Sequence, residues 1–254
     1  MIATRTEVSR KDSLQDGLSP FDRSVLSLLE KTEYRFCESG EDLEAIYRLR
    51  YASYLAAGMV REDARRMVTD RFDDLPNAYR FGVFHDGALV STIRLHYVDS
   101  SYSTSPSNEV FGDVLQPRIA AGETFIDPSR FAAAPEWSRA LRVLPYVTLR
   151  LVILACKHFR PSYCLTAIKE EHTAFYTRIF NAVPATSART YPGLTIPVYL
   201  LQSTCRVDED SFFQRFPYFR STAFERRMLF DRPKHGELAP LTILPTAKYL
   251  KNAA

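Results

Sequence analysis

Hydrophobic and polar residues follow two different periods along the chain, which predicts helices and strands in one layered fold. In 41–59, apolar residues recur at helical spacing, so this segment is expected to form an amphipathic helix. In 79–99, apolar and polar residues alternate around Asp86-Gly87, a pattern typical of a β-hairpin with a tight turn. A nearly continuous apolar run at 144–159 predicts a buried helix.

Further segments extend this pattern. A short helix is expected after Ser19, because Pro20 suits the first helical position and Asp22 the first turn. Loops are expected at 100–113 and around Pro135. Strands are predicted at 34–40, 123–133, 162–168 and 195–203, with a second amphipathic helix at 169–180. The intermixed order predicts a mixed α/β (α+β) fold of packed layers.

The same order predicts three parts of the chain. Residues 1–33 form an extension with a short helix, 34–205 form the core, and 206–254 form a C-terminal extension packed on that core. The polar residues 1–18 are expected to be disordered or loosely attached. With 254 residues, 46% of them hydrophobic, the chain is long enough to bury a core without metal or disulfide support.

The composition limits which cellular compartment and which classes of binding partner are expected. The net charge of +3 is too small to indicate a nucleic-acid surface. The four cysteines Cys37, Cys156, Cys164 and Cys205 lie far apart, as expected for free thiols in a reducing compartment. The N-terminus lacks a continuous apolar stretch, and Arg150 interrupts the most apolar run, so neither a secretory signal nor a membrane span is expected. We therefore expect a cytoplasmic protein.

Familiar catalytic motifs are absent from the sequence. There is no Gly-rich phosphate loop of the GxxxxGK[ST] or GxGxxG type, and no GxSxG nucleophile elbow. The five histidines show no HExxH or Cys/His spacing, so no metal site is expected.

Charged residues nevertheless occupy unusual positions. Arg50 lies on the apolar stripe of the first long helix, and Arg94 lies within a strand. Others fall in a loop and in the 123–133 strand: Asp70, Asp73, Asp127 and Arg130. Each of them is compatible with a solvated surface position. As a group they are also compatible with one buried ion-pair cluster, because paired charges are tolerated in a protein interior.

The order of these residues resembles the autoinducer synthases and the related N-acyl amino acid synthases, both of the GNAT acyltransferase fold. The likeness spans about 35–203 and rests on RYASY with Arg50 and Tyr54, DRFD with Asp70 and Asp73, STIRL with Arg94, DPSRF with Asp127, Ser129 and Arg130, and AFYTRIF with Tyr176. It implies a mixed sheet with a splayed strand pair and helices on both faces. Pro128 in the DPSRF strand agrees with a bulge or splay there.

Three departures from these families refine the expectation. Asp127 stands where they usually carry Glu, no tryptophan follows the first long helix, and no glycine-rich phosphate loop precedes the 144–159 helix. These departures favour an N-acyl amino acid synthase over a lactone synthase. They also favour a donor presented on acyl carrier protein, as a phosphopantetheine thioester, over acyl-CoA.

The resemblance implies transfer of a long-chain acyl group from acyl carrier protein to the α-amine of an amino acid, with no permanently bound cofactor. Alternation along the strand places Asp127 and Ser129 on one face, toward a substrate cleft, and Arg130 on the other. Asp127 is then the candidate base or water-positioning group. Tyr176 is a candidate proton donor to the leaving thiolate, or a packed aromatic residue.

The remaining roles follow from the same resemblance. Arg94 and Arg130 either pair with Asp70 and Asp73 or bind the carboxylate of the amino acid. The other residues expected to bind the substrate are Arg50, Tyr54, Phe131 and Ala133. Those expected to bind the acyl donor are Arg139, Arg142 and Tyr146. The alternatives are an acyl-homoserine lactone synthase using S-adenosylmethionine, a GNAT enzyme using acyl-CoA, and a non-catalytic protein that binds acyl chains or acyl carrier protein.

Overall fold

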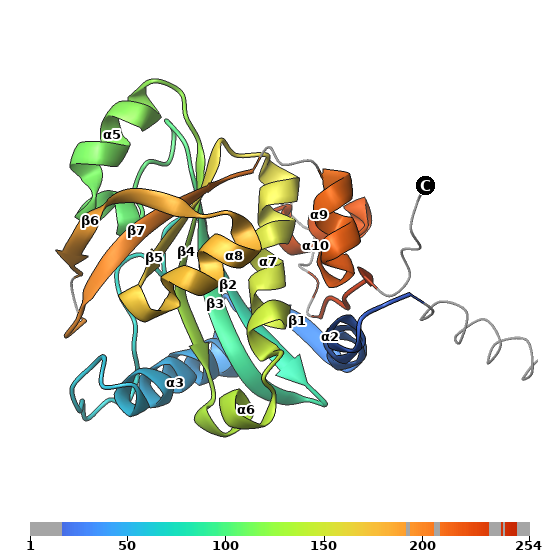
Figure 1. Cartoon of the computed structure of the whole chain (residues 1–254). Helices are drawn as coiled ribbons and strands as arrows, with labels where there is room; N and C mark the ends of the chain where they lie inside the picture. Colours follow the sequence, from blue (N-terminus) through green and yellow to red (C-terminus); the bar gives the residue numbers. More distant parts are fainter. Residues whose placement is uncertain (1–16, 192–193, 206–208, 234–239, 241, 248–254) are drawn as a thin grey trace, which may run out of the picture.

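A seven-stranded open sheet in the order β1-β2-β3-β4-β5-β7-β6 forms the centre of the computed structural model (Figure 1). The structure describes residues 17–191, 194–205, 209–233, 240 and 242–247. The strands are β1 Thr32–Phe36, β2 Ala78–His85, β3 Ala88–Val98, β4 Phe125–Ala133, β5 Tyr163–Ile168, β6 Val183–Thr190 and β7 Pro197–Thr204. All neighbouring strands are antiparallel except β4 and β5.

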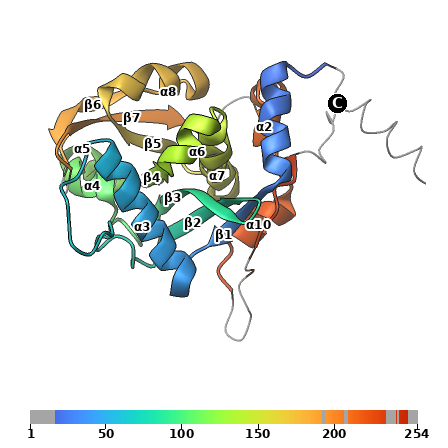
Figure 2. The ribbon, with the colours of Figure 1, turned by 90° about the horizontal axis from the view of Figure 1, so that it is seen from below.

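Helices cover both faces of this sheet (Figure 2). Helix α3, Gly40–Ala56, packs on β3 and β4 from one face, and α7, Leu144–Phe159, packs on the same two strands from the other. The remaining helices are α2 Pro20–Glu30, α4 Pro106–Val110, α5 Gly112–Ala120, α6 Pro135–Ala140, η1 Glu170–His172, α8 Thr173–Phe180, α9 Glu209–Arg215, η2 Pro217–Phe219 and α10 Ala223–Phe230. The predicted mixed fold with helices on both faces is confirmed.

Several elements form where local signals predicted them. Ser19 and Asp22 make a reciprocal capping box at the start of α2, which satisfies free backbone N–H groups of its first turn. Asp86 and Gly87 have φ angles of 47° and 81°, so both central residues of the hairpin turn are left-handed. Helix α7 has the predicted bounds. Its apolar run is buried between the sheet and the C-terminal helices.

Three short elements differ from the prediction. The loop expected at 100–113 contains α4 and the start of α5, and Leu115 and Ile119 of α5 join the core that includes Phe125. Helix α6 replaces the loop expected around Pro135. Strand β6 was not predicted, because it is an edge strand with no buried residue and therefore lacks an apolar alternation. The prediction for residues 1–16 lies outside the described residues.

Strands β4 and β5 are paired only at one end. Phe125 pairs with Tyr163 and Ile126 with Cys164, and the register records no pair beyond them. Pro128 has no backbone N–H to offer, and Arg130 has a φ of 55° beside a register shift in β3. From Asp127 onward the edge of β4 that faces β5 is therefore unpaired within the sheet. This is the splayed strand pair that the sequence resemblance implies.

The C-terminal extension is held to the core by a buried ion pair. Arg150 of α7 pairs with Glu225 of α10, and both side chains are fully buried. Arg150 also donates to the carbonyl oxygens of Tyr218 at 2.8 Å and Arg220 at 2.5 Å. These contacts explain an arginine inside the apolar run of α7. None of the helices in the described part of the chain is both long and apolar enough to cross a bilayer.

Candidate functional site

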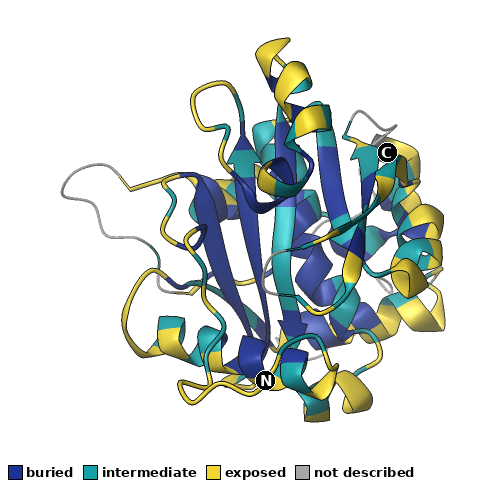
Figure 3. Cartoon of the chain, turned by 90° about the vertical axis from the view of Figure 1, so that its left-hand side faces the viewer, coloured by how far each residue is buried: buried dark blue, intermediate teal, exposed yellow. Residues whose placement is uncertain are grey.

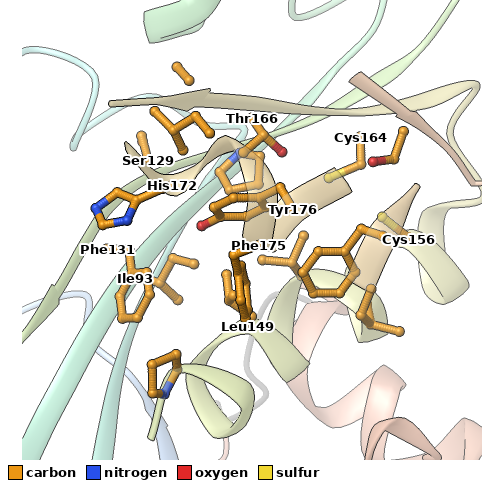
Figure 4. Close-up of a pocket in the computed structure, with 18 of the residues that line it drawn as sticks. Ile93, Ser129, Phe131, Leu149, Cys156, Cys164, Thr166, His172, Phe175 and Tyr176 are labelled. Carbon is orange, nitrogen blue, oxygen red and sulfur yellow. The ribbon is translucent and has the colours of Figure 1, made fainter. Parts of the chain in front are cut away.

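A cavity of about 480 Å³ opens where β4 and β5 diverge (Figure 4). This volume lies within the usual range for small-molecule sites. One face of α7 lines it along the helix, with apolar side chains for most of its length. These residues are Pro145, Leu149, Val152, Ile153, Cys156 and Lys157. Helix α8 covers the same cavity with Phe175, Tyr176 and Phe180. The lining is suited to an elongated apolar ligand.

The cavity also reaches the opposite face of the sheet. Tyr54 of α3 and Met59 just after it line the cavity together with Tyr191. A smaller cavity of about 170 Å³ lies on this face, lined by Asp70, Arg71, Phe72, Pro106, Glu109, Val110, Arg130 and Tyr191. Arg130 and Tyr191 line both cavities. Two ligands can therefore approach Arg130 from opposite faces of the sheet.

An ionic cluster lies beneath this junction. Arg94 contacts Asp70 at 2.5 Å and Asp73 at 2.9 Å. Arg50 pairs with Asp73 at 2.9 Å, and Arg130 pairs with Asp70 at 2.5 Å. Arg50 and Arg94 are fully buried, and Figure 3 shows strands of the sheet mostly in the buried colour, with exposed residues toward the periphery. The three guanidinium groups carry one more charge than the two carboxylates, which favours an anionic ligand nearby.

Both carboxylates of this cluster are ionised at neutral pH. Burial alone would raise the pKa of Asp70, but hydrogen bonds and charges from Arg94 and Arg130 outweigh it and hold that pKa well below its usual range. Burial also opposes ionisation of Asp73, and Arg50 and Arg94 lower its pKa overall. A carboxylate with a lowered pKa is a weak base, so Asp70 and Asp73 are suited to structure rather than to proton abstraction.

A β-bulge at Arg130 changes which side chains of β4 lie next to one another. Ser129 accepts a hydrogen bond from Arg94 Nε at 3.0 Å, and Arg130 binds Asp70 in the same cluster. The expectation that Ser129 and Arg130 face opposite sides is therefore wrong. The left-handed φ of Arg130 interrupts the alternation of the strand and turns its side chain toward Asp70.

Asp127 is fully buried and lines neither cavity. Its carboxylate accepts from the Ser107 backbone N–H at 2.9 Å and from the Ser107 hydroxyl at 2.6 Å. The sequence placed Asp127 toward a substrate cleft, and the structure instead places it against the first turn of α4. Helix α4 supplies Pro106, Glu109 and Val110 to the smaller cavity, so Asp127 supports that wall from behind.

Tyr54, Phe131 and Tyr176 line the main cavity, as do Ser129 and Arg130. The Tyr54 hydroxyl lies 3.5 Å from the Phe131 carbonyl oxygen, to which it donates. Figure 4 shows the Tyr176 hydroxyl directed toward the side of the cavity where His172 and Ser129 lie. Burial raises the pKa of Tyr176 well above its ordinary value, so this hydroxyl remains protonated at neutral pH.

Four further predicted residues lie outside the cavity lining, in addition to Asp127 and the buried members of the ionic cluster. Ala133 pairs with Ser91 of β3. Arg139 and Arg142 are exposed, immediately before α7 and the Pro145 end of the cavity. Tyr146 packs its ring against Phe21, Phe175 and Tyr218 instead of facing the cavity, which corrects its predicted contact with the donor.

The sequence did not indicate several residues that the structure brings to the cavity. His172 and Tyr191 line it from a 3-10 turn and from the end of β6, and no motif marks either residue. Cys156, Cys164 and Cys205 also meet there. Contacts with the other two thiols, together with burial, raise the pKa of Cys156 above its usual value, so it is a poor nucleophile. Their wide spacing in the sequence concealed this cluster.

His96 supports the ionic cluster as a neutral side chain. Its Nε2 atom donates to the Phe72 carbonyl oxygen at 2.9 Å, while Nδ1 is buried without a partner among the described residues. Burial, followed by the charge of Arg94, lowers its pKa to about 3, although Asp70 and Asp73 act in the opposite direction. Protonating Nδ1 would therefore place an unpaired charge in the core.

Folding stability should consequently fall as the pH decreases from 6.5 to 4. In this range the histidine of the unfolded chain binds a proton that His96 in the folded chain does not, which costs about 3 kcal/mol of unfolding free energy. Urea denaturation at several pH values will measure this loss. His96→Gln should remove most of it, whereas His172→Gln, at an exposed position, should not. Equal pH dependence in wild type and His96→Gln would contradict the assignment.

The chain is similar to known proteins in both sequence and fold. The profile of the family described as N-acyl amino acid synthase FeeM matches residues 45–204. The structure of FeeM, an N-acyl amino acid synthase from uncultured soil microbes, is similar at 17% identity, covering 71% of this chain and 93% of that one, with a TM-score of 0.54.

Two lactone synthases share the fold as well. The acyl-homoserine lactone synthase LasI has 13% identity, covering 71% of this chain and 92% of its own, with a TM-score of 0.54. The CoA-dependent acyl-homoserine lactone synthase BjaI, solved with MTA, has 17% identity, covering 69% of this chain and 82% of its own, with a TM-score of 0.51. None of the curated proteins compared with the chain matches it significantly.

Proposed function

The chain belongs to the N-acyl amino acid synthase FeeM family and is an acyltransferase, and on this premise we propose that it transfers a long-chain acyl group to the α-amine of an amino acid. The observation that carries the proposal is the main cavity, which passes through the sheet at the splay of β4 and β5. An acyl thioester and an amine that enter from opposite faces meet beside Ser129, Arg130 and Phe131.

The acyl donor occupies the apolar part of the cavity, along α7. Its thioester carbonyl lies against the unpaired edge of β4, where backbone N–H groups stabilise the developing oxyanion. One well-placed donor of this kind contributes on the order of 3 kcal/mol. Arg139 and Arg142, exposed beside the Pro145 end, are suited to the acidic surface of a carrier protein or to the phosphate of its phosphopantetheine arm.

The amino acid occupies the smaller cavity. Arg130 and Arg71 line it, paired with Asp70 and Glu109, and their remaining N–H groups can bind the carboxylate of the amino acid. Phe72, Val110 and Tyr191 surround the side chain. The excess positive charge of the ionic cluster supports the same orientation. The α-amine then points toward Arg130 and the thioester.

The reaction requires one proton to leave the amine and one to reach the departing thiolate. The α-amine of a free amino acid is more basic than a peptide N-terminus, whose pKa is about 8, so only a small neutral fraction, on the order of 1% or less, forms at pH 7 without a strong base. None of the described residues lining the main cavity is an aspartate or glutamate, and the acidic residues of the smaller cavity, Asp70 and Glu109, are paired with Arg130 and Arg71. His172, which also lines the main cavity, lies on an exposed turn. We therefore assign proton removal to water, and protonation of the thiolate to Tyr176. In this mechanism the amine nitrogen forms the new amide bond as the carbon–sulfur bond breaks.

The test supplies the purified protein with acyl carrier protein thioesters or acyl-CoA, together with each proteinogenic amino acid. Mass spectrometry should detect N-acyl amino acids, formed faster from the carrier-bound donor and more slowly as salt screens Arg139 and Arg142. Lactone formed from S-adenosylmethionine would instead assign the chain to lactone synthesis. Donor binding without any acylated product would overturn the enzymatic proposal.

Asp127→Asn separates a positioning role from a catalytic one. The Asn amide can keep both contacts with Ser107, because its oxygen accepts from the backbone N–H and its NH2 group can donate to the hydroxyl oxygen, so α4 should stay in place. We therefore expect the KM for the amino acid and kcat to stay within about threefold of wild type. Ser107→Ala, which removes one buried hydrogen bond, should raise the KM about tenfold in kinetic assays. If Asp127 were the base, kcat of Asp127→Asn would fall about a hundredfold.

A further inference from the structure

Helix α9 contributes side chains to the acyl cavity from outside the region that matches the family. The family profile ends at residue 204, and Phe212 and Phe213 of α9 line the cavity together with Cys205. Figure 1 shows α9 beside the end of α7 that leads toward β5. This C-terminal segment is therefore part of the cavity wall as well as a cover for the core.

The position of α9 along the cavity follows from α7. The lining face of α7 runs from Pro145 to Lys157, twelve residue steps that correspond to about 18 Å along a helix axis. Pro145 lies at the open end of the splay. Lys157 lies at the other end, where β4 and β5 are still paired and Thr204 of β7 pairs with Tyr163. Cys205 follows directly, so α9 bounds the end of the cavity that is distant from the thioester.

Packing holds this end wall in place. The Lys157 ammonium lies 4.5 Å from the centre of the Phe213 ring, and Phe213 is 9% exposed. The rings of Phe212 and Phe219 are stacked, with centroids 5.7 Å apart. The turn that contains Phe219 is tied to α7, because Arg150 donates to the neighbouring Tyr218 carbonyl oxygen. A wall fixed by these contacts cannot yield easily to a longer ligand.

We propose that Phe212 and Phe213 of α9 set the maximum length of the acyl chain that the enzyme accepts. The inference rests on the proposed function for the identity of the ligand, a fatty acyl chain whose methyl end reaches α9. A chain that extends beyond this point must displace aromatic rings, whereas a shorter one leaves part of the apolar wall uncovered. The length limit therefore belongs to the C-terminal extension, and the chemistry belongs to the β4–β5 splay.

The test is competition among acyl donors of even chain length, with the N-acyl products quantified by mass spectrometry. Phe212→Ala and Phe213→Ala should shift the preferred length upward, by about tenfold in product ratio for a two-carbon step. Phe212→Trp should shift it downward. The matched control is Phe216→Ala, since Phe216 is buried beside Phe212 and does not line the cavity.

A second measurement separates this inference from the proposed function. Calorimetric binding of free fatty acids of graded length depends on the cavity alone and needs neither acceptor nor carrier. The same shifts should appear there even if no amino acid is acylated. An unchanged length preference in all three Phe212 and Phe213 variants, or an equal shift in Phe216→Ala, would overturn the role of α9. Thermal melting of each variant is compared with that of the wild-type protein, so that a variant that fails to fold is recognised.

Discussion

Replacing Arg94 with methionine is expected to abolish detectable acyl transfer and to lower the unfolding free energy by about 3–5 kcal/mol. Arg94 is fully buried and contacts both Asp70 and Asp73, and it also donates to Ser129. Methionine fills similar volume but leaves two buried carboxylates with less compensation. Ser129, next to the proposed thioester position, loses its hydrogen-bond donor. Urea denaturation and N-acyl product formation will measure the two effects.

Two variants serve as controls for this prediction. Arg94→Lys keeps one charge but lacks the planar fork needed to reach both carboxylates and Ser129, so an intermediate loss is expected. Arg48→Met removes an exposed pair with Glu44, and its cost should stay below about 0.5 kcal/mol. If Arg94→Met retained wild-type stability and activity, the ionic cluster would not support the site as described.

The Tyr176→Phe enzyme is expected to show a kcat about a hundredfold lower than wild type, with stability and KM nearly unchanged. Phenylalanine keeps the aromatic packing against Phe175 and Phe180 and removes only the hydroxyl. Because burial raises the pKa of Tyr176, wild-type activity should rise with the titration of the α-amine up to about pH 9 and show no alkaline decline below pH 10. Steady-state kinetics across pH will measure both.

Tyr146→Phe is the matched control for this second prediction. Tyr146 lies in the first turn of α7 and packs among aromatic rings without lining the cavity. Loss of its hydroxyl should leave kcat within about twofold of wild type, as expected for a residue outside the reacting groups. If Tyr176→Phe behaved like Tyr146→Phe, Tyr176 would have a packing role only, and the thiolate would have to take its proton from water.

Elements with strong local signals were predictable from the sequence. Ser19 and Pro20 specify a helix start through capping and a preset φ angle, and Asp86-Gly87 specifies a hairpin turn that few residue pairs adopt. The apolar run 144–159 exceeds the length of a strand, so it specifies a buried helix. The short helices α4 and α6 carry too few periodic residues for such a signal. Ser105 caps α4, and α6 packs through the partly buried Trp137.

The candidate site was also predictable from the sequence only in part. By itself, the sequence determined which residues carry unusual charge, because Arg50 on an apolar stripe and Arg94 in a strand are costly unless paired. Only the tertiary structure decided the partners, since ion pairs between α3, the 70–73 turn and the sheet depend on contacts distant in sequence. Alternation assumes an unbroken strand, and the bulge at Arg130 breaks it. The tertiary structure therefore also decided that Arg130 joins Ser129 while Asp127 supports α4.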